Sequence, residues 1–511
     1  MNATSVPRPR PASAPTGPEA ARPHVVVVGG GIAGLAAAAR LSGVAGGDGT
    51  GCRVTLLESA GRLGGKLLSG EVGGVPVDLG AEAVFVRQPS VLELAREAGL
   101  GDELEPPVTT EASLWTRGAL RPLPRGHLMG IPADLDSLAA CGVLSDDGLA
   151  RARQDLSLPR TEVGDDIAVG RYVAARLGRE VVDRLVEPLL GGVYAGQADR
   201  ISLRAALPHL LPVAREERSL LEGIRRMRTP QATGPGPGTP GSGTAQPPFR
   251  SVRGGLGRLP LAVGRACRSA GVDIRTATAA RTLRRTGDGW RLTVRDASGE
   301  QRLEADAVVL AVPAPAAARL LADEVPAAAA ALRTVEYADM ALVTLVYDRT
   351  DLPGGLPGSG FLVPPVDDRL IKASTFLSSK WAWPGRYAPE TAVVRTSVGR
   401  YGEDTALRLD DEELVSRSRA ELHAATGLAA PPRATAVTRW ATGLPQYTVG
   451  HVARMGRVRE HVGRLGTLAV CGAAYDGVGI TSCVESAQRA AEAITAELGA
   501  RRGEEFRREH T

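Results

Sequence analysis

Apolar residues in this chain are gathered into short runs that end at a glycine, a proline or a charged residue. The first run, His24 to Val28, contains four valines and leads through a glycine-rich turn into the alanine-rich stretch Ile32 to Leu41. This order predicts a strand followed by a helix, and the unbroken apolar run indicates a strand of a parallel sheet that is buried on both faces. A second apolar run, Arg53 to Leu57, is closed by Glu58 and predicts the next strand.

Two later runs have the same character. Ala307 to Val312 stops at Pro313, and Leu468 to Cys471 stops at Gly472, so each run predicts a short buried strand. We expect both strands to join the first sheet. One domain would then be assembled from segments that lie far apart in the chain, with substrate-facing segments inserted between them.

The remaining periodicity predicts helices and a second sheet. Apolar residues recur at helical spacing over Asp165 to Arg184 and over Glu485 to Leu498, whereas Val335 to Tyr347 and Thr391 to Val398 have the pattern of strands. Residues 229 to 248 consist largely of Pro, Gly, Ser and Thr and predict a surface insertion without helix or strand. The Pro/Ala-rich N-terminus predicts a disordered tail.

Composition narrows the class of protein. A hydrophobic content of 43% and a charged content of 23% are ordinary for a globular protein, and 511 residues suffice for two or more packed domains. No apolar run approaches the roughly 20 residues that span a bilayer, and the N-terminus lacks the apolar core of a signal peptide, so we expect a cytoplasmic protein without a transmembrane segment. Peripheral membrane contact stays open.

Charge and cysteine content exclude two further classes. The formal net charge of +4 is small and evenly spread, which does not favour nucleic-acid binding. Five cysteines without C-x-x-C spacing predict reduced thiols rather than a disulfide framework or a metal site.

The turn after the first strand has the spacing G-x-G-x-x-G, formed by Gly29, Gly31 and Gly34. In a strand–turn–helix unit the first glycine permits the tight turn, the second allows a pyrophosphate to approach the backbone, and the third lets the helix pack closely on the strand. Free N–H groups and the positive helix end would hold the phosphates, and Glu58 is placed to accept hydrogen bonds from a ribose. The alternative is a glycine-rich turn that binds nothing, which the flanking strand, helix and acidic strand end make the weaker interpretation.

Three more loops carry candidate chemistry. Ser59 to Lys66 places basic side chains in a glycine-rich loop, and Val77 to Glu82 offers small residues where a planar ring could lie against the backbone. Near the other end, Cys471 to Ile480 joins a predicted strand to a helix N-terminus, whose dipole would stabilise the negative charge of a reduced flavin. Ordinary surface turns and an ordinary strand-to-helix crossover are the alternatives.

Between and beyond these loops the chain contains further motifs: EPLLGGVYAG (Glu187 to Gly196), ISLR (Ile201 to Arg204), RGGL (Arg253 to Leu256), SSKW (Ser378 to Trp381) and the segment from Cys471 to Cys483. In this combination the chain resembles the protoporphyrinogen oxidase family from about Pro23 to Leu498. Within that family it is most similar to the bacterial oxygen-dependent coproporphyrinogen III oxidases. The central EPLLGGVYAG block is far more specific than the nucleotide motif.

The resemblance implies an α/β fold. It would comprise a Rossmann-like FAD-binding domain assembled from distant segments, an α+β substrate domain and a helical domain over the cleft. The expected boundaries are a tail at 1–22, an FAD-binding domain at 23–90, 250–330 and 435–500, a helical domain with some substrate-domain segments at 91–228, a flexible insertion at 229–249, a substrate-binding domain at 331–434 and a tail at 501–511.

The activity that the resemblance implies is oxidation of coproporphyrinogen III to coproporphyrin III in haem biosynthesis, with noncovalent FAD, consumption of O2 and release of H2O2. Protoporphyrinogen IX is the alternative substrate; a flavin amine oxidase and a non-catalytic FAD-binding protein are more distant alternatives. The chemistry would belong to flavin N5, and we name no catalytic side chain. A transient contact with a ferrochelatase is the partner that we expect.

The family's cofactor contacts fall on this sequence at Gly29, Gly30, Gly31, Ile32, Ala33, Gly34 and Leu35 (pyrophosphate), Glu58 and Ser59 (ribose), Arg62, Lys66, Gly80, Ala81, Glu82 and Ala83 (flavin end), Ala280 (adenine), and Trp440, Gly472, Val478, Gly479 and Ile480 (isoalloxazine). At Ala280 the family usually has valine, which puts the side-chain packing there in doubt. Because coproporphyrinogen has four propionates, we expect cations at its site and name Arg87 and Lys380, with Tyr194 as an aromatic that could pack on the macrocycle.

Overall fold

The computed structural model describes residues 22–45, 51–86, 88–228, 248–287, 289–352, 355–403 and 405–509. The predicted N-terminal tail and the predicted insertion, apart from residues 22, 248 and 249, lie outside the described residues, as does Arg87. Among the described residues, no helix combines the length and the apolar character that crossing a membrane requires.

The predicted parallel sheet is present and is built from distant segments. Its strand order is β10-β2-β1-β14-β20, and all four neighbouring pairs run parallel. The strands are β1 (His24–Val28), β2 (Arg53–Leu57), β10 (Asp273–Arg275), β14 (Ala307–Leu310) and β20 (Leu468–Val470). The two late strands expected to join the first sheet therefore do so, each ending a residue or two earlier than its apolar run.

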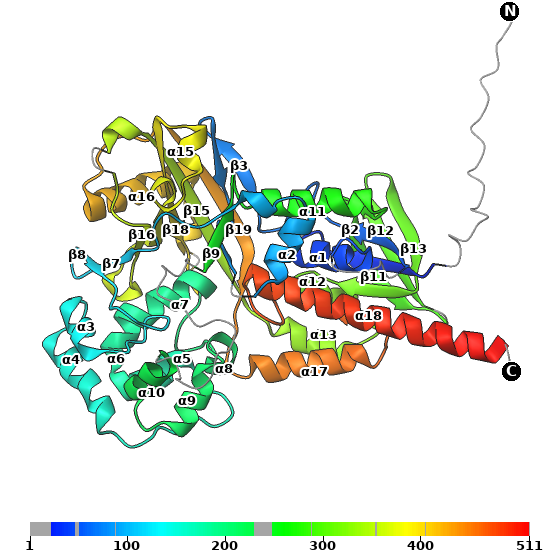
Figure 1. The fold of residues 1–511 in the computed structure, drawn as a ribbon, viewed down its shortest axis with the longest axis horizontal. Helices are drawn as coiled ribbons and strands as arrows, with labels where there is room; N and C mark the ends of the chain where they lie inside the picture. The colour runs from blue at the N-terminus through cyan, green and yellow to red at the C-terminus, as the bar shows by residue number, and fades with distance from the viewer. Residues whose placement is uncertain are drawn as a thin grey trace, which may run out of the picture.

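Helices cover one face of this sheet and a second layer covers the other. The first face packs against α1, α18, α11 and α2, and the second against a three-stranded meander and the helices α12, α13 and α17. In Figure 1 the long C-terminal helix α18 lies along α1, although the two helices come from opposite ends of the chain. The bounds are α1 (Ile32–Leu41), α2 (Ser90–Glu97), α11 (Arg258–Ser269), β11 (Ala279–Arg285), β12 (Trp290–Asp296), β13 (Gly299–Ala305), α12 (Ala314–Leu320), α13 (Pro326–Arg333), α17 (His451–Gly463) and α18 (Ile480–Glu509).

Helix α18 is longer than predicted at both ends. It begins five residues before Glu485, and residues 501–509, expected to be a tail, continue it.

The second sheet has seven strands in the order β19-β15-β18-β17-β16-β7-β8. The two predicted strands correspond to β15 and β18, which pair with each other antiparallel. Helix α16 packs on one face through the side chains of Leu414 and Leu422. The bounds are β7 (Ala112–Thr116), β8 (Ala119–Pro122), β15 (Tyr337–Asp348), β16 (Gly360–Leu362), β17 (Ile371–Phe376), α14 (Leu377–Lys380), α15 (Pro384–Tyr387), β18 (Thr391–Val398), α16 (Asp411–Thr426) and β19 (Ala434–Pro445).

A third region consists of short helices that pack on one another. They are α3 (Leu135–Ala140), α4 (Asp146–Arg153), α5 (Val169–Leu177), α6 (Arg179–Val181), a π-helical turn (Val182–Val186), α7 (Glu187–Tyr194), α8 (Leu203–Ala206), α9 (Leu210–Glu216) and α10 (Leu220–Arg228). The helix predicted over Asp165 to Arg184 is thus broken at Gly178. This residue has φ +93°, a conformation that ends α5 and that side-chain-bearing residues rarely adopt.

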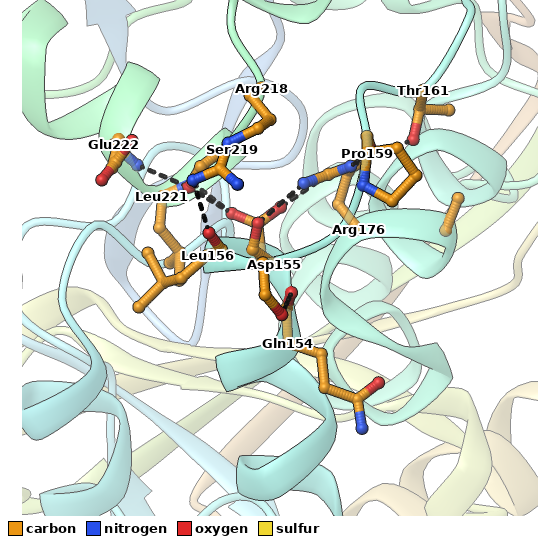
Figure 2. Close-up of polar contacts among 12 residues, drawn as sticks. Gln154, Asp155, Leu156, Pro159, Thr161, Arg176, Arg218, Ser219, Leu221 and Glu222 are labelled. Atoms are coloured by element: carbon orange, nitrogen blue, oxygen red, sulfur yellow. Dashed lines mark hydrogen bonds and ion pairs between the residues drawn. The ribbon is translucent and has the colours of Figure 1, made fainter.

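A buried ion pair ties this region together. The Asp155 carboxylate accepts hydrogen bonds from Arg176 Nε (2.6 Å), from Ser219 Oγ (2.7 Å) and from the Leu221 backbone N–H (2.9 Å). Figure 2 shows Asp155 between these donors, which come from two other segments of the chain, helix α5 and the start of α10. Both charged side chains are essentially inaccessible, at 0% and 1% exposure, so the pair joins α5 to the start of α10 through groups that water does not reach.

Small ribbons connect the larger parts. They are β3 (Ser69–Val72) with β4 (Val75–Asp78), and β9 (Phe249–Val252) with β5 (Val84–Phe85) on one side and β6 (Leu104–Glu105) on the other.

Candidate cofactor site

The three glycines of the turn after β1 differ in what surrounds them. Gly29 has φ +114°, and its N–H donates to the Leu57 carbonyl (2.7 Å), which fixes the turn to the end of β2. A Cβ on Gly34 would lie 1.8 Å from the Gly29 carbonyl oxygen, so the helix can pack here only without a side chain. A Cβ on Gly31 would meet no heavy atom of the described residues within 4 Å. Gly31 therefore faces open space at the N-terminus of α1.

Glu58 holds this turn from the neighbouring strand. Its Oε2 accepts from the Gly30 N–H (2.7 Å) and its Oε1 from the Ala60 N–H (2.7 Å). The carboxylate thus organises the backbone around the turn and also lines the adjacent cavity. Oε1 also accepts from Ser59 Oγ (3.3 Å), whereas Oε2 has one partner and can accept a second hydrogen bond, which leaves Glu58 able to bind a ribose hydroxyl.

A cavity of about 550 Å³ begins at this turn and is walled by segments from both ends and the middle of the chain. Of the residues predicted to contact the cofactor, those that line it are Gly29, Gly31, Ile32, Ala33, Glu58, Ser59, Lys66, Ala81, Ala280, Gly472, Val478 and Ile480. The structure therefore brings residues from all five predicted groups to one space.

The cavity carries a surplus of positive charge. Among the described residues that line it, Lys66, Arg281 and Arg319 are cationic and Glu58 is the one carboxylate. The N-terminus of α1 adds the positive end of a helix dipole and free N–H groups. An extended ligand with a diphosphate fits this set of donors, since open space at Gly31 allows an anion to reach the backbone.

Sequence reasoning missed Arg281 and Arg319. Both side chains line the cavity, Arg281 from strand β11 and Arg319 from helix α12. Neither lies in a motif, and 61 of the 511 residues are Lys or Arg, so the residue type by itself carries no signal.

The far end of the cavity is formed by the loop that follows β20 and by the first turn of α18. Two cysteines, Cys471 and Cys483, line this end. Burial raises the pKa of both thiols, to about 12 for Cys483, so they are uncharged near neutral pH and make poor nucleophiles. The Tyr447 hydroxyl donates to the Ala473 carbonyl and supports the loop from outside the cavity.

Three of the predicted cofactor residues that do not line the cavity surround its wall. Trp440 Nε1 donates to the Leu79 carbonyl (3.0 Å), and the Arg62 guanidinium lies 6.0 Å from the Trp440 ring while it donates to the Gly65 carbonyl. A Cβ on Gly80 would lie 2.0 Å from the Lys66 carbonyl oxygen. These residues hold neighbouring backbone segments in place.

The other predicted residues that do not line the cavity lie in the surrounding protein. Gly30 packs against Glu58, Gly34 against Gly29, and Leu35 lies in the core beneath the sheet. Ala83 packs in the cluster that contains the buried Trp381 and Trp383, and Gly479 accepts a hydrogen bond from the Cys483 N–H at the start of α18.

Glu82 and Lys380, predicted to contact the cofactor and the substrate respectively, instead contact each other. Lys380 Nζ lies 2.6 Å from Glu82 Oε1, and Arg395 Nη2 lies 2.7 Å from Glu82 Oε2. Burial by itself raises the pKa of Glu82, but the two cations outweigh it and hold the pKa below its usual value. The carboxylate is therefore ionised and already has two partners.

Tyr194, the predicted aromatic contact of the substrate, is buried between helices. Its ring lies 5.7 Å from that of Tyr447, which in turn stacks on His451 at 4.0 Å. Burial raises the pKa of Tyr194 to about 12 and lowers that of His451 to about 4. Both groups are uncharged at neutral pH, so this stack contributes packing rather than charge.

Comparison with known proteins shows a matching family and similar proteins over most of the chain. The profile of the family described as flavin containing amine oxidoreductase matches residues 32–495. Coproporphyrinogen III oxidase of Mycobacterium tuberculosis is 38% identical over 479 residues, which is 93% of this chain and 98% of the relative. Protoporphyrinogen oxidase of Bos taurus is 31% identical over 92% of this chain and 98% of the relative. A crystal structure from Exiguobacterium sp. 255-15, of a protein named after protoporphyrinogen oxidase, superposes with a TM-score of 0.79 at 32% identity and covers 93% of this chain and 99% of that one.

Proposed function

We propose that the chain is an oxidase that uses FAD and O2 to convert coproporphyrinogen III to coproporphyrin III in haem biosynthesis and releases H2O2. The chain belongs to the flavin containing amine oxidoreductase family. The observation that carries this proposal is the 38% identity, over nearly the full length of both chains, to a coproporphyrinogen III oxidase. Identity of that extent covers the cofactor cavity, the seven-stranded sheet and the helical region together.

The cavity supports FAD as the cofactor. Its lining carries the cations for a diphosphate, the Glu58 carboxylate for a ribose and an apolar far end for a ring system. When bound, FAD takes up two electrons at a time and passes them to O2, so the six-electron oxidation of a porphyrinogen requires three rounds.

The protein's own contribution is to bind and orient. The helix α1 N-terminus and Gly31 hold the diphosphate, Glu58 accepts from the ribose, and Lys66 supplies positive charge within the lining. The thiols of Cys471 and Cys483 stay protonated and do not compete as nucleophiles. Protons from the pyrrole N–H groups leave to solvent, and we assign no side chain as general base.

Protoporphyrinogen IX is the second candidate substrate, because a protoporphyrinogen oxidase also matches 92% of the chain. Its identity of 31% lies within the range of 30% to 38% found for the coproporphyrinogen III oxidases, and the upper end of that range favours the first substrate. The two substrates differ in charge, with four propionates against two.

Steady-state rates in air with each porphyrinogen, followed by porphyrin fluorescence, test the assignment. We expect coproporphyrinogen III to be oxidised at the higher kcat/KM, and an equal or reversed preference would refute the substrate assignment. Under anaerobic conditions coproporphyrinogen III should bleach the flavin absorbance. Bleaching by an amine but by neither porphyrinogen would show instead a flavin amine oxidase.

Cellular context completes the proposal. The porphyrin product must next receive iron, and we therefore propose that the enzyme makes transient contact with a ferrochelatase. We also propose that the enzyme is cytoplasmic. Co-sedimentation of the two purified proteins with and without coproporphyrin III tests that contact.

A further inference from the structure

Arg395 directs its guanidinium to one short segment of the chain. From strand β18 of the seven-stranded sheet, its Nη1 donates to the carbonyls of Asp78 (2.8 Å) and Gly80 (2.9 Å), and its Nη2 donates to the Glu82 carboxylate (2.7 Å). All three acceptors belong to residues 78–82, which we call the 78–82 loop. The residue is 8% exposed, so these hydrogen bonds form away from water.

The 78–82 loop is part of the wall of the cofactor cavity. Ala81 lines the cavity and its N–H donates to the Lys66 carbonyl (3.2 Å). A Cβ on Gly80 would lie 2.0 Å from that same carbonyl oxygen, so the loop packs directly on the backbone of Lys66. A displacement of the loop would therefore move two lining residues, Ala81 and Lys66, at once.

The charges around the loop are balanced within the protein. Asp78 and Glu82 contribute two buried carboxylates, and Arg395 and Lys380 contribute two cations. The Asp78 carboxylate also accepts from the Leu256 N–H (2.9 Å) and from Ser69 Oγ (2.6 Å), and burial raises its pKa. A cluster this enclosed has a defined geometry only while every charge keeps its partner.

We propose that Arg395 is a positioning residue for the flavin, one that fixes the 78–82 loop against Lys66 and so links the seven-stranded sheet to the wall of the cofactor cavity. The proposal rests on the proposed flavin site but not on the identity of the substrate. An arginine is required because its planar fork reaches two carbonyls and a carboxylate together. A lysine at the same place would keep a single point charge and could not reproduce that set.

Arg400 offers a matched control. It follows the same strand, is also 8% exposed, and donates to two backbone carbonyls, those of Val363 and Arg369. Neither carbonyl belongs to a residue that lines the cofactor cavity. Arg400 also contacts the Glu403 carboxylate (3.4 Å), and its hydrogen bonds, at 3.2 to 3.4 Å, are longer than those of Arg395. Arg395→Lys and Arg400→Lys thus each remove the hydrogen bonds of a buried guanidinium to two carbonyls and a carboxylate, at sites that do and do not support the cavity.

The test compares wild type, Arg395→Lys and Arg400→Lys as purified full-length enzymes. We expect Arg395→Lys to weaken FAD binding about tenfold to a hundredfold, as loss of one charge-assisted hydrogen bond would do, and to change the visible circular dichroism of the bound flavin. Both substitutions should lower the unfolding temperature, because each removes hydrogen bonds of a buried guanidinium. Arg400→Lys should nevertheless leave the FAD dissociation constant within about twofold of wild type.

Equal effects of the two substitutions on FAD affinity and on the flavin spectrum would overturn the proposal and reduce Arg395 to a structural residue. If Arg395→Lys does not fold, Glu82→Gln removes one charge from the same cluster and must show the same change in flavin spectrum for the proposal to stand. Porphyrinogen turnover enters neither readout, so a wrong substrate assignment would leave the outcome of this test unaffected.

Discussion

Two glycines that lie three residues apart should respond to an added side chain in different ways. Gly31 has φ −72° and ψ 177°, which any residue can adopt, and its missing Cβ points into open space. The missing Cβ of Gly34 would lie 1.8 Å from a backbone oxygen. We therefore expect Gly31→Val to fold and to lose FAD, and Gly34→Ala to lose stability.

The magnitudes follow from these environments. A branched side chain at Gly31 would displace a diphosphate from the N–H groups of the helix end; each such charge-assisted hydrogen bond contributes about 1.5–3 kcal/mol, so losing two weakens binding about 10²- to 10⁴-fold. The unfolding free energy of the apoprotein should change by less than about 1 kcal/mol. At Gly34 the obstructing atom is backbone, so the turn or the helix must shift, at a cost of about 3 kcal/mol or more.

Flavin content and stability are measured on the same preparations. The flavin to protein ratio and an FAD titration report binding, and urea unfolding of the FAD-free proteins followed by circular dichroism reports the free energy of unfolding. Stoichiometric flavin in Gly31→Val would refute the role given to Gly31. A wild-type urea midpoint for Gly34→Ala would refute the close packing of α1 on the turn.

Four further substitutions, one of them a control, probe charge. Asp155→Ala leaves the Arg176 guanidinium buried without its partner and should cost about 3–5 kcal/mol in urea unfolding, whereas Glu460→Ala, which breaks an exposed helical pair, should cost less than about 1 kcal/mol. Burial raises the pKa of Glu187 from 4.5 to about 7, so the folded state keeps this proton to a higher pH than the unfolded state does. The free energy of unfolding should therefore fall as pH rises from 4.5 to about 7, and Glu187→Gln should make this fall less steep when unfolding is measured from pH 5 to 8. Burial lowers the pKa of Lys66, so FAD affinity should decline as pH rises toward that lowered pKa, and Lys66→Met should bind FAD more weakly with no such decline.

The sequence predicted the parallel sheet well because its strands are buried on both faces and therefore read as unbroken apolar runs. The exception is the edge strand β10, Asp273–Arg275, which was not predicted. Its first residue is exposed, and it has too few apolar positions to form a recognisable apolar run. The helix over Asp165 to Arg184 was predicted through Gly178 because periodicity reports only which face is apolar. It does not report the positive φ that ends the helix there.

At the site, too, local sequence patterns were predictable and contacts between distant residues were not. Glycine spacing predicts the diphosphate end because the turn at Gly29 and the close packing at Gly34 are local steric requirements, while Gly31 leaves open space for a ligand, and these residues do line or support the cavity. The partner of Lys380 could not be predicted, since Glu82 lies 298 residues away in the chain. Arg395 had no motif to mark it, and its role depends on three acceptors that only the folded chain brings together.

The pairing of Lys380 changes the expectation for substrate recognition. A substrate propionate that took Lys380 from Glu82 would leave the buried Glu82 carboxylate with the Arg395 guanidinium as its remaining partner, next to a second buried carboxylate, that of Asp78. Breaking a buried pair in this way costs about 3–5 kcal/mol, more than an exposed ion pair with the substrate returns. Lys380 is also only 21% exposed, which restricts access to its ammonium. The charge of Lys380 is therefore better explained by its place in the loop cluster, and the propionates of a coproporphyrinogen would be bound by cations outside that cluster.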